Sequence, residues 1–166
     1  FSLVYDGAGK NYTASASGVS GFSYTYSGVS PTTYGPSSTA PTNVGTYKIT
    51  ASSTDPNYSG SKEVNFSITP APVTVIAAAK TKAFGSADPA LTYTASGLIG
   101  FDVLSGALTR AEGENVGSYS ILQGTLSVGS NYSISYTGSS LQITSAMLSQ
   151  DSITITAPFS VVYDGA

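Results

Sequence analysis

The chain has 166 residues and a formal net charge of −3, and charged residues make up only 9% of it. Its six Lys and Arg residues cannot form a basic stripe that neutralises phosphates, so neither nucleic acid nor an anionic membrane surface is an expected partner. The chain has no Cys and no His, which removes the usual zinc and haem ligands, the thiol nucleophile and the general base that titrates nearest neutral pH. We therefore expect no cofactor, no metal and no catalytic activity, and no apolar run is long enough for membrane insertion.

The start of the chain is repeated at its end. Residues 1–8 read FSLVYDGA and residues 159–166 read FSVVYDGA, an offset of 158 residues. The motif's aromatic residue also has a counterpart midway, because Tyr5, Phe84 and Tyr163 are spaced by 79 residues each time. A fixed period indicates repeated structural units. The sequence therefore predicts two divergent domains that alternate within a longer array, of which this chain is an internal fragment.

Strands are predicted where apolar and polar side chains alternate. The clearest are residues 22–26, 64–68 and 132–136, each with one apolar and one polar face. Gly, Pro, Asn and Asp provide turns at short intervals between them. The one helix-like stretch is residues 98–104, where Phe101 and Leu104 could share a single turn that Gly100 weakens. These patterns predict an all-β fold of two small β-sandwich (Ig-like) domains in tandem, with a β-grasp-like fold as the alternative.

Proline marks the first domain boundary. ITPAP at residues 68–72 ends one alternating segment and precedes VTVI at residues 73–76, so Pro70 and Pro72 should stiffen a very short junction. We place the first domain at residues 1–71, the second at residues 72–147 and the start of a third unit at residues 148–166. ITIT at residues 153–156 resembles VTVI as an opening strand. The same alignment puts the opening strand of the first domain upstream of Phe1.

Two recurring motifs are interpreted as structural. In NVG[TS]Y, Gly45 and Gly117 allow a tight backbone at the start of a strand, and the hydroxyls of Tyr47 and Tyr119 can cap a loop as in the tyrosine corner of sandwich domains. The second motif pairs an aromatic residue with a turn. Its members are Tyr5, Asp6 and Gly7 in the first half and Phe84 and Gly85 in the second.

Three ligand or crosslink alternatives stay open. Calcium could bind Asp6 and Asp164, with Asp88, Glu112 and Glu114 as the other carboxylate candidates, although the nine carboxylates form no calcium-loop pattern. Cell-surface glycans could stack on aromatic rings, and Tyr12, Tyr34 and Tyr58 are the rings most expected at the surface because they flank turns. A Lys-to-Asn crosslink would need Lys48 or Lys62 buried beside an Asn and a carboxylate.

Longer motifs resemble a known family. In the first half they are VYDG, TAPTNVGTYKITAS and DPNYSGS, and in the second they are KAFGSADPALTYTASGL, LSGALTR, GENVGSYSI and GTLSVGSNYSI. Together they resemble the MBG and YDG repeat domains of large bacterial adhesins. The second half resembles the YGX-type MBG domain, with Phe84-Gly85 in place of its usual Tyr-Gly. The resemblance covers essentially the whole chain, implies an extracellular or cell-surface location in a bacterium, and carries no catalytic residues.

Three functions follow from these observations. The first is a non-catalytic stalk or spacer whose partners are neighbouring repeats. The second is a strand-donating subunit of a head-to-tail filament, in which Ile153, Thr154, Ile155 and Thr156 complete the sheet of the next molecule. In a longer array the same strand would complete a sheet of its own chain instead. The third is a carbohydrate-binding adhesin module.

Overall fold

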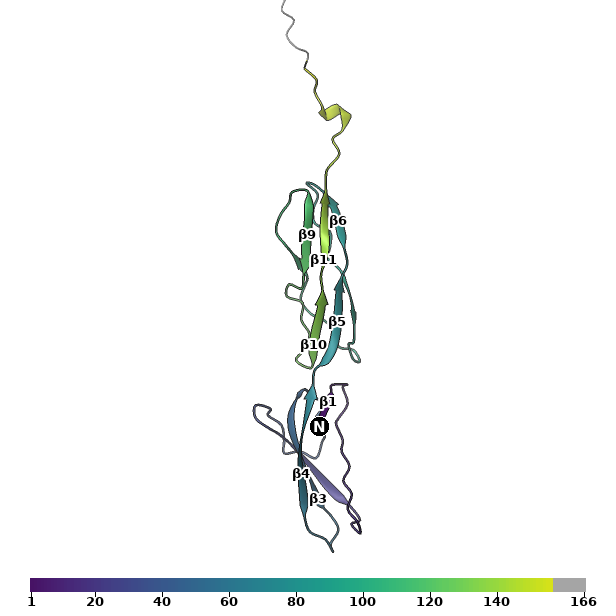
Figure 1. The fold of residues 1–166 in the computed structure, drawn as a ribbon, viewed down its shortest axis with the longest axis vertical. Coiled ribbons are helices and arrows are strands. Elements are labelled where there is room, and N and C mark those ends of the chain that lie inside the picture. Colours follow the sequence, from purple (N-terminus) through teal and green to yellow (C-terminus); the bar gives the residue numbers. More distant parts are fainter. Residues whose placement is uncertain (157–166) are drawn as a thin grey trace, which may run out of the picture.

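The computed structural model describes residues 1–156, and this part of the chain is all-β. Its strands form two bodies that follow one another along a single long axis (Figure 1). The only helix among the described residues is one turn of 3-10 helix, η1 (Gln150–Ser152). Since a β-grasp fold packs a helix across its sheet, the described residues fit the sandwich-like prediction and not the β-grasp alternative.

The first domain contains one four-stranded sheet. Its strands are β1 (Ser2–Val4), β2 (Phe22–Gly28), β3 (Gly45–Ser53) and β4 (Ser61–Thr69), in the order β1-β4-β3-β2. β1 runs parallel to β4, and the other pairs are antiparallel. The core on one face of the sheet consists of Tyr26, Ala40, Tyr47, Ile49, Phe66 and Ile68. Within the strands, these positions alternate with polar residues that are exposed or half-buried, which is why the alternating segments form half-buried strands.

The second domain contains two sheets. One has the order β10-β5-β7, from β5 (Ala71–Ala77), β7 (Tyr93–Ser96) and β10 (Tyr132–Thr137). The other has the order β6-β11-β9-β8, from β6 (Lys80–Ala83), β8 (Thr109–Arg110), β9 (Gly117–Leu122) and β11 (Ser139–Thr144). Their shared core consists of Val73, Val75, Ala77, Leu108, Ile121, Leu126 and Leu141. Burying each of the larger aliphatic side chains stabilises the fold by about 1.5–3 kcal/mol.

Two adjacent chain segments pass from one sheet to the other. β5 and β6 are separated by Ala78 and Ala79, and β10 and β11 are separated by Gly138 alone. A Cβ at Gly138 would lie 3.0 Å from the carbonyl oxygen of Ile121, so glycine lets the two backbones approach at this crossing.

The helix-like stretch at residues 98–104 forms only one hydrogen-bonded turn. The Asp102 amide donates to the carbonyl of Ile99 at 3.2 Å, and Gly100 has a φ of 61°. A right-handed helix does not propagate through this left-handed backbone. Phe101 is consequently fully exposed rather than packed beside Leu104.

Candidate functional site

The junction between the two domains is the candidate site, because the chain crosses it in an unusually short step. β4 ends at Thr69 and β5 begins at Ala71, which leaves Pro70 as the only residue between the two strands. The Tyr5 amide donates to the carbonyl of Thr69 at 2.9 Å, and the Ala71 amide donates to the carbonyl of Asn131 at 2.9 Å. Backbone hydrogen bonds therefore fix the chain on both sides of a proline whose φ is already restricted.

One side chain bridges the two domains directly. Asn131, which precedes β10, accepts a hydrogen bond on its Oδ1 from the Val44 amide at 2.9 Å. Its Nδ2 donates to the Oδ1 of Asn43 at 3.0 Å. Asn43 and Val44 belong to the loop that leads into β3. The single side chain thus connects the loops that start β3 in one domain and β10 in the other.

An aromatic contact lies beside this bridge. The rings of Tyr5 and Tyr132 meet edge to face, with centroids 5.4 Å apart. The Tyr132 hydroxyl donates to Asp102 Oδ2 at 2.5 Å and accepts from the Ile99 amide at 3.1 Å. Burial, together with the neighbouring Asp102 carboxylate, raises the pKa of Tyr132 above its usual value. The loop after β7 is thereby held against the first domain.

The turn glycine of the first domain also touches the second domain. Gly7 has a φ of 78°, and a Cβ there would lie 3.3 Å from Ile99 Cγ2. Asp6 accepts a hydrogen bond from the Ala8 amide at 2.9 Å and forms an ion pair with Lys10. These interactions lower the pKa of Asp6, the Lys10 hydrogen bond more than the Ala8 amide.

Comparison with known proteins assigns each half of the chain to one family. Residues 1–72 match the family model described as the MBG domain, and residues 73–142 match the model described as the MBG domain of YGX type. The chain is a tandem of two MBG domains. MBG domains are found in bacterial surface proteins and are generally non-catalytic. No curated protein and no solved structure matches the chain.

The two motif tyrosines occupy equivalent places in the two MBG domains. The Tyr47 hydroxyl donates to the carbonyl of Asn43 at 2.8 Å, and the Tyr119 hydroxyl donates to the carbonyl of Asn115 at 2.8 Å. A Cβ at Gly45 would lie 2.8 Å from Thr32 Cγ2, so space rather than a left-handed backbone favours glycine there.

The sequence reasoning missed the glycine that makes room for Tyr119. A Cβ at Gly113 would lie 2.1 Å from Tyr119 Cε1, and Gly113 has a φ of 135°. At Gly117, in contrast, a Cβ would find its nearest atoms 3.8 Å away.

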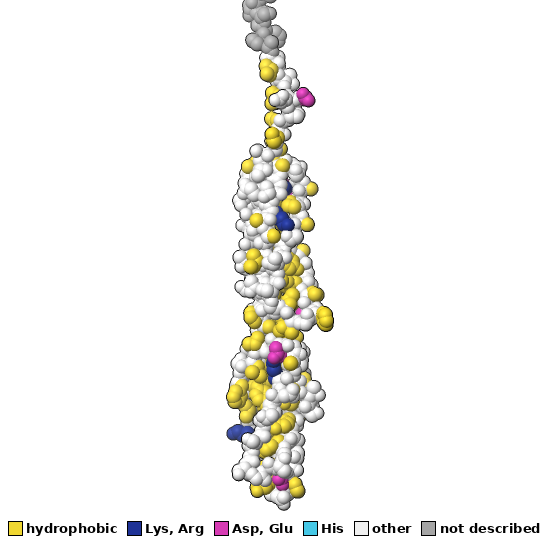
Figure 2. Space-filling model, turned by 90° about the vertical axis from the view of Figure 1, so that its right-hand side faces the viewer, with side chains coloured by type: hydrophobic (Ala, Val, Ile, Leu, Met, Phe, Trp, Pro, Cys, Tyr) yellow, Lys and Arg dark blue, Asp and Glu magenta, His cyan; other side chains and the backbone are white. Residues whose placement is uncertain are grey.

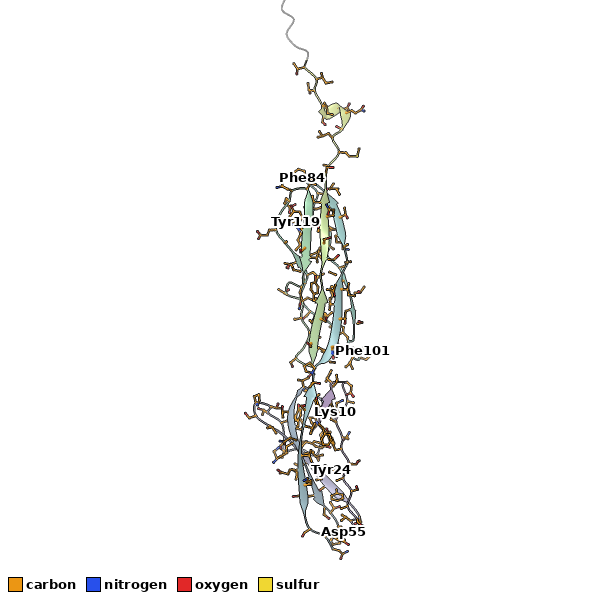
Figure 3. All side chains as sticks on the ribbon, in the orientation of Figure 1. Lys10, Tyr24, Asp55, Phe84, Phe101 and Tyr119 are labelled. Atoms are coloured by element: carbon orange, nitrogen blue, oxygen red, sulfur yellow. The ribbon has the colours of Figure 1, made fainter. Side chains whose placement is uncertain are left out.

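The far end of the second domain repeats part of the junction. Phe84 is the counterpart of Tyr5 at this end (Figure 3). Its amide donates to the carbonyl of Thr144 at 2.8 Å, as the Tyr5 amide does to that of Thr69. Gly85 follows with a φ of 79°, close to that of Gly7. Phe84 and Val116 are exposed, whereas their counterparts in the first domain lie against the second.

The carboxylates considered for calcium are paired with cations. Lys82, whose side chain is only 4% exposed, lies 2.6 Å from Asp88 and 2.5 Å from Glu114. Arg110 binds Asp88 at 2.6 Å, also pairs with Glu114, and lies over the Tyr119 ring. Hydrogen bonds from Arg110 and Lys82 lower the pKa of Asp88 to about 2, and hydrogen bonds from Lys82 and Arg110 lower that of Glu114. The pKa of Lys82 is raised by Asp88 and Glu114.

Neither calcium nor a crosslink gains support from these side chains. Glu112 is exposed and forms no ion pair within residues 1–156, and Asp164 lies outside the described residues. No group of three or more metal-ligating side chains occurs within residues 1–156. Lys48 is 37% exposed and pairs with Glu63 at 2.8 Å, while Lys62 is exposed, so neither meets the burial condition for a Lys-to-Asn crosslink.

Two of the three tyrosines expected at the surface are half-buried. Tyr12 packs on Phe66 with ring centroids 4.9 Å apart. Tyr34 packs edge to face on Tyr47, and its hydroxyl donates to the carbonyl of Thr39 at 2.7 Å. The first domain has no Trp and few aliphatic residues, so it fills its core with these rings. Only Tyr58 is exposed.

The tail of the described chain follows the second domain. After η1, residues 153–156 carry no regular secondary structure, and their side chains are exposed. No helix in the described part of the chain is long and apolar enough to cross a membrane.

Proposed function

We propose that this MBG tandem is a rigid spacer in an extracellular bacterial surface protein, where it holds a distal part of the parent chain away from the cell. The observation that carries the proposal is the junction, in which Pro70 alone separates two strands. Asn131 and the Tyr5–Tyr132 contact restrict bending about that residue. A junction with a single free residue and side-chain contacts on two sides resists rotation in more than one direction.

The repeated surface at the far end extends this proposal to neighbouring repeats. Phe84, Gly85, Asn115 and Val116 are the counterparts of Tyr5, Gly7, Asn43 and Val44. A third domain that docked through its own counterparts of Asn131 and Tyr132 would reproduce the same junction. The partner of this end is therefore the next repeat of the array.

The surface chemistry suits a spacer. Charged residues are 9% of the chain, and most of its exposed strand positions carry Ser or Thr. Such a surface offers few ionic contacts to other molecules, which suits a part of the chain that spaces rather than binds.

The test is small-angle X-ray scattering on arrays of one, two and three copies of residues 1–158. The maximum dimension should grow linearly with copy number while the cross-sectional radius stays constant. The matched control carries Gly-Ser-Gly inserted after Pro70 in every copy. The spacer function is refuted if the maximum dimension grows less than linearly with copy number and grows equally in the arrays with and without the insertion.

A further inference from the structure

An open apolar groove runs along the first domain. Its volume is about 520 Å³. One wall is formed by residues 12–16 and the other by residues 58–64, and Phe22, Tyr24, Ile49 and Ala51 line the space between them. Figure 2 shows hydrophobic side chains gathered on the surface of this domain. Tyr24 and Val64, which belong to the core cluster, are only partly buried beside the groove.

The second domain has a strand at the corresponding place. β5 lies between β10, to which it is parallel, and β7, to which it is antiparallel. Its inward side chains, Val73 and Val75, are completely buried, whereas Thr74 and Ile76 face outward. β5 is thus the central strand that closes this layer of the sandwich.

The two walls of the groove are the counterparts of the strands that flank β5. YTASASG at residues 12–18 aligns with LTYTASG at residues 91–97, which contains β7, at a constant offset of 79. Both segments end at a glycine with positive φ, 78° at Gly18 and 96° at Gly97. NYSGSKE at residues 57–63 aligns with NYSISYT at residues 131–137, which contains β10, at an offset of 74.

The place between these walls holds no strand from residues 1–156. On the side away from β3, β4 pairs with β1 only at Ser67, Ile68 and Thr69, which leaves the edge that begins at Ser61 without a strand partner in the described chain. Residues 14–17 are the counterparts of β7 but are not a strand. Residues 14–17 and β7 alternate in the same way, but only the second domain supplies a central strand, β5, to pair with. For this reason β7 is a strand and residues 14–17 are not.

A candidate partner is present in the chain itself. Residues 153–156 carry no regular secondary structure, Ile153 has an extended backbone, and Ile153 and Ile155 are exposed, the latter at 90%. Their sequence, ITIT, alternates as VTVI does in β5. An exposed segment that alternates and pairs with no sheet is suited to strand addition. In this mode its main chain hydrogen-bonds to a sheet edge, and every second side chain fills the groove.

We propose that the groove is a strand-acceptor site and that in the isolated chain its occupant is the 153–156 segment of a second copy, the counterpart of the opening strand that the repeat alignment places before Phe1. The inserted strand runs parallel to residues 60–63 and antiparallel to residues 14–17. Ile153 and Ile155 take the inward places of Val73 and Val75, and Thr154 and Thr156 face outward. Isolated copies joined in this way form a head-to-tail filament, whereas in a longer array the same strand would lie in the groove of the next repeat of one chain. The inference does not depend on the spacer function, because a rigid single chain could leave its groove empty.

The test uses paired variants of the tail in sedimentation velocity over a wide concentration range. The wild-type chain should show a mass that rises with concentration. Ile153→Lys/Ile155→Lys should abolish this rise, because charged side chains would enter an apolar groove. Thr154→Lys/Thr156→Lys adds the same charge on the outward side and should assemble like the wild type. All four residues are exposed in the single chain, so neither variant perturbs its fold.

A second measurement locates the contact. A synthetic peptide of residues 149–158, added to the full chain at a concentration where the chain is monomeric, should protect the amides of residues 14–17 and 60–63 from hydrogen exchange. The same peptide with Lys in place of both Ile residues should leave them unprotected. The proposal is overturned if the chain is monomeric up to millimolar concentration, if the Thr pair abolishes assembly as the Ile pair does, or if an apolar dye binds in the groove and the peptide fails to displace it.

Discussion

At the scale of single residues, hydrogen-bonded tyrosines secure the loops that precede β3 and β9. Tyr47 is 3% exposed, and its hydroxyl donates to the carbonyl of Asn43 at 2.8 Å. Replacing such a donor removes a hydrogen bond and leaves a partly buried acceptor unsatisfied. The NVG[TS]Y pattern predicts this role for both tyrosines because each tyrosine and the carbonyl that it binds belong to the same short motif.

We expect Tyr47→Phe to lower the free energy of unfolding of the first domain by about 1 kcal/mol. Urea denaturation followed by tyrosine fluorescence measures this change. Tyr93→Phe is the control, because Tyr93 is exposed and its hydroxyl has no hydrogen bond within the described chain. Equal stabilities for the two variants would contradict the capping role.

The ion-pair cluster of the second domain predicts a dependence on acid. The pKa of Asp88 is about 2 in the folded chain, below its usual 3.8. Its stabilising contribution is therefore fully present above the usual pKa and is lost as the pH falls from about 4 toward 2. Asp88→Asn should reduce stability at neutral pH and flatten the stability curve in this range. Asp151→Asn, at a carboxylate with no ion pair in the described chain, should follow the wild-type curve.

The cluster itself could not be predicted from the sequence. Asp88 is separated from Arg110 by a length of chain that includes β7 and a long loop, and four charged residues that meet in space leave no local pattern. The sequence indicated only that Asp88 and Glu114 are carboxylates. Their neutralisation by Lys82 and Arg110 depends on the pairing of β6 with β11 and of β9 with β8.

At the scale of strands, alternation predicted β2, β4 and β10 but not which neighbours they would have. Residues 14–17 and β7 share the same alternation, and only the presence of β5 makes one of them a strand. β6 and β8 are too short to carry a pattern. Pairing across the chain, which a local sequence does not encode, decides these elements.

The close approach at the end of β7 gives a prediction at this scale. Gly97 has a φ of 96°, and a Cβ there would lie 2.4 Å from the carbonyl oxygen of Pro72, in β5. We expect Gly97→Ala to destabilise the second domain by about 1–3 kcal/mol through backbone strain and steric overlap. Thermal unfolding measures the loss.

Two other glycines serve as graded controls for this variant. Gly85 has a φ of 79° but open space around a Cβ, so Gly85→Ala should cost about 1 kcal/mol from the backbone alone. Gly129 has open space and no positive φ, so Gly129→Ala should change little. Any other order among the three losses would mean that the contact between β5 and β7 is not as close as described.

At the scale of the whole molecule, a repeat period and a proline-rich boundary predicted two domains in series. They did not predict the contacts that hold the domains in line, because Asn43 and Asn131 are 88 residues apart and each belongs to a separate repeat. The bridge arises only when β4 continues into β5 with Pro70 between them.

Removing the bridge should loosen the junction without unfolding either domain. Asn131→Ala deletes both side-chain hydrogen bonds to the first domain but keeps the backbone bond from Ala71 to residue 131. Residual dipolar couplings measured separately for the two domains should then report larger relative motion. The control is Asn65→Ser, at an exposed position on the outer face of β4, and it should leave the couplings unchanged.

The most direct test of the account is the distribution of distances across the junction. The chain has no Cys, so cysteines introduced as Asn65→Cys and Ser135→Cys would be the only sites that take a spin label. Both are exposed positions, on β4 and β10. Double electron–electron resonance should give a single narrow distance distribution, which broadens when Gly-Ser-Gly is inserted after Pro70. A distribution in the uninterrupted chain as broad as that of the insertion variant would contradict a rigid junction.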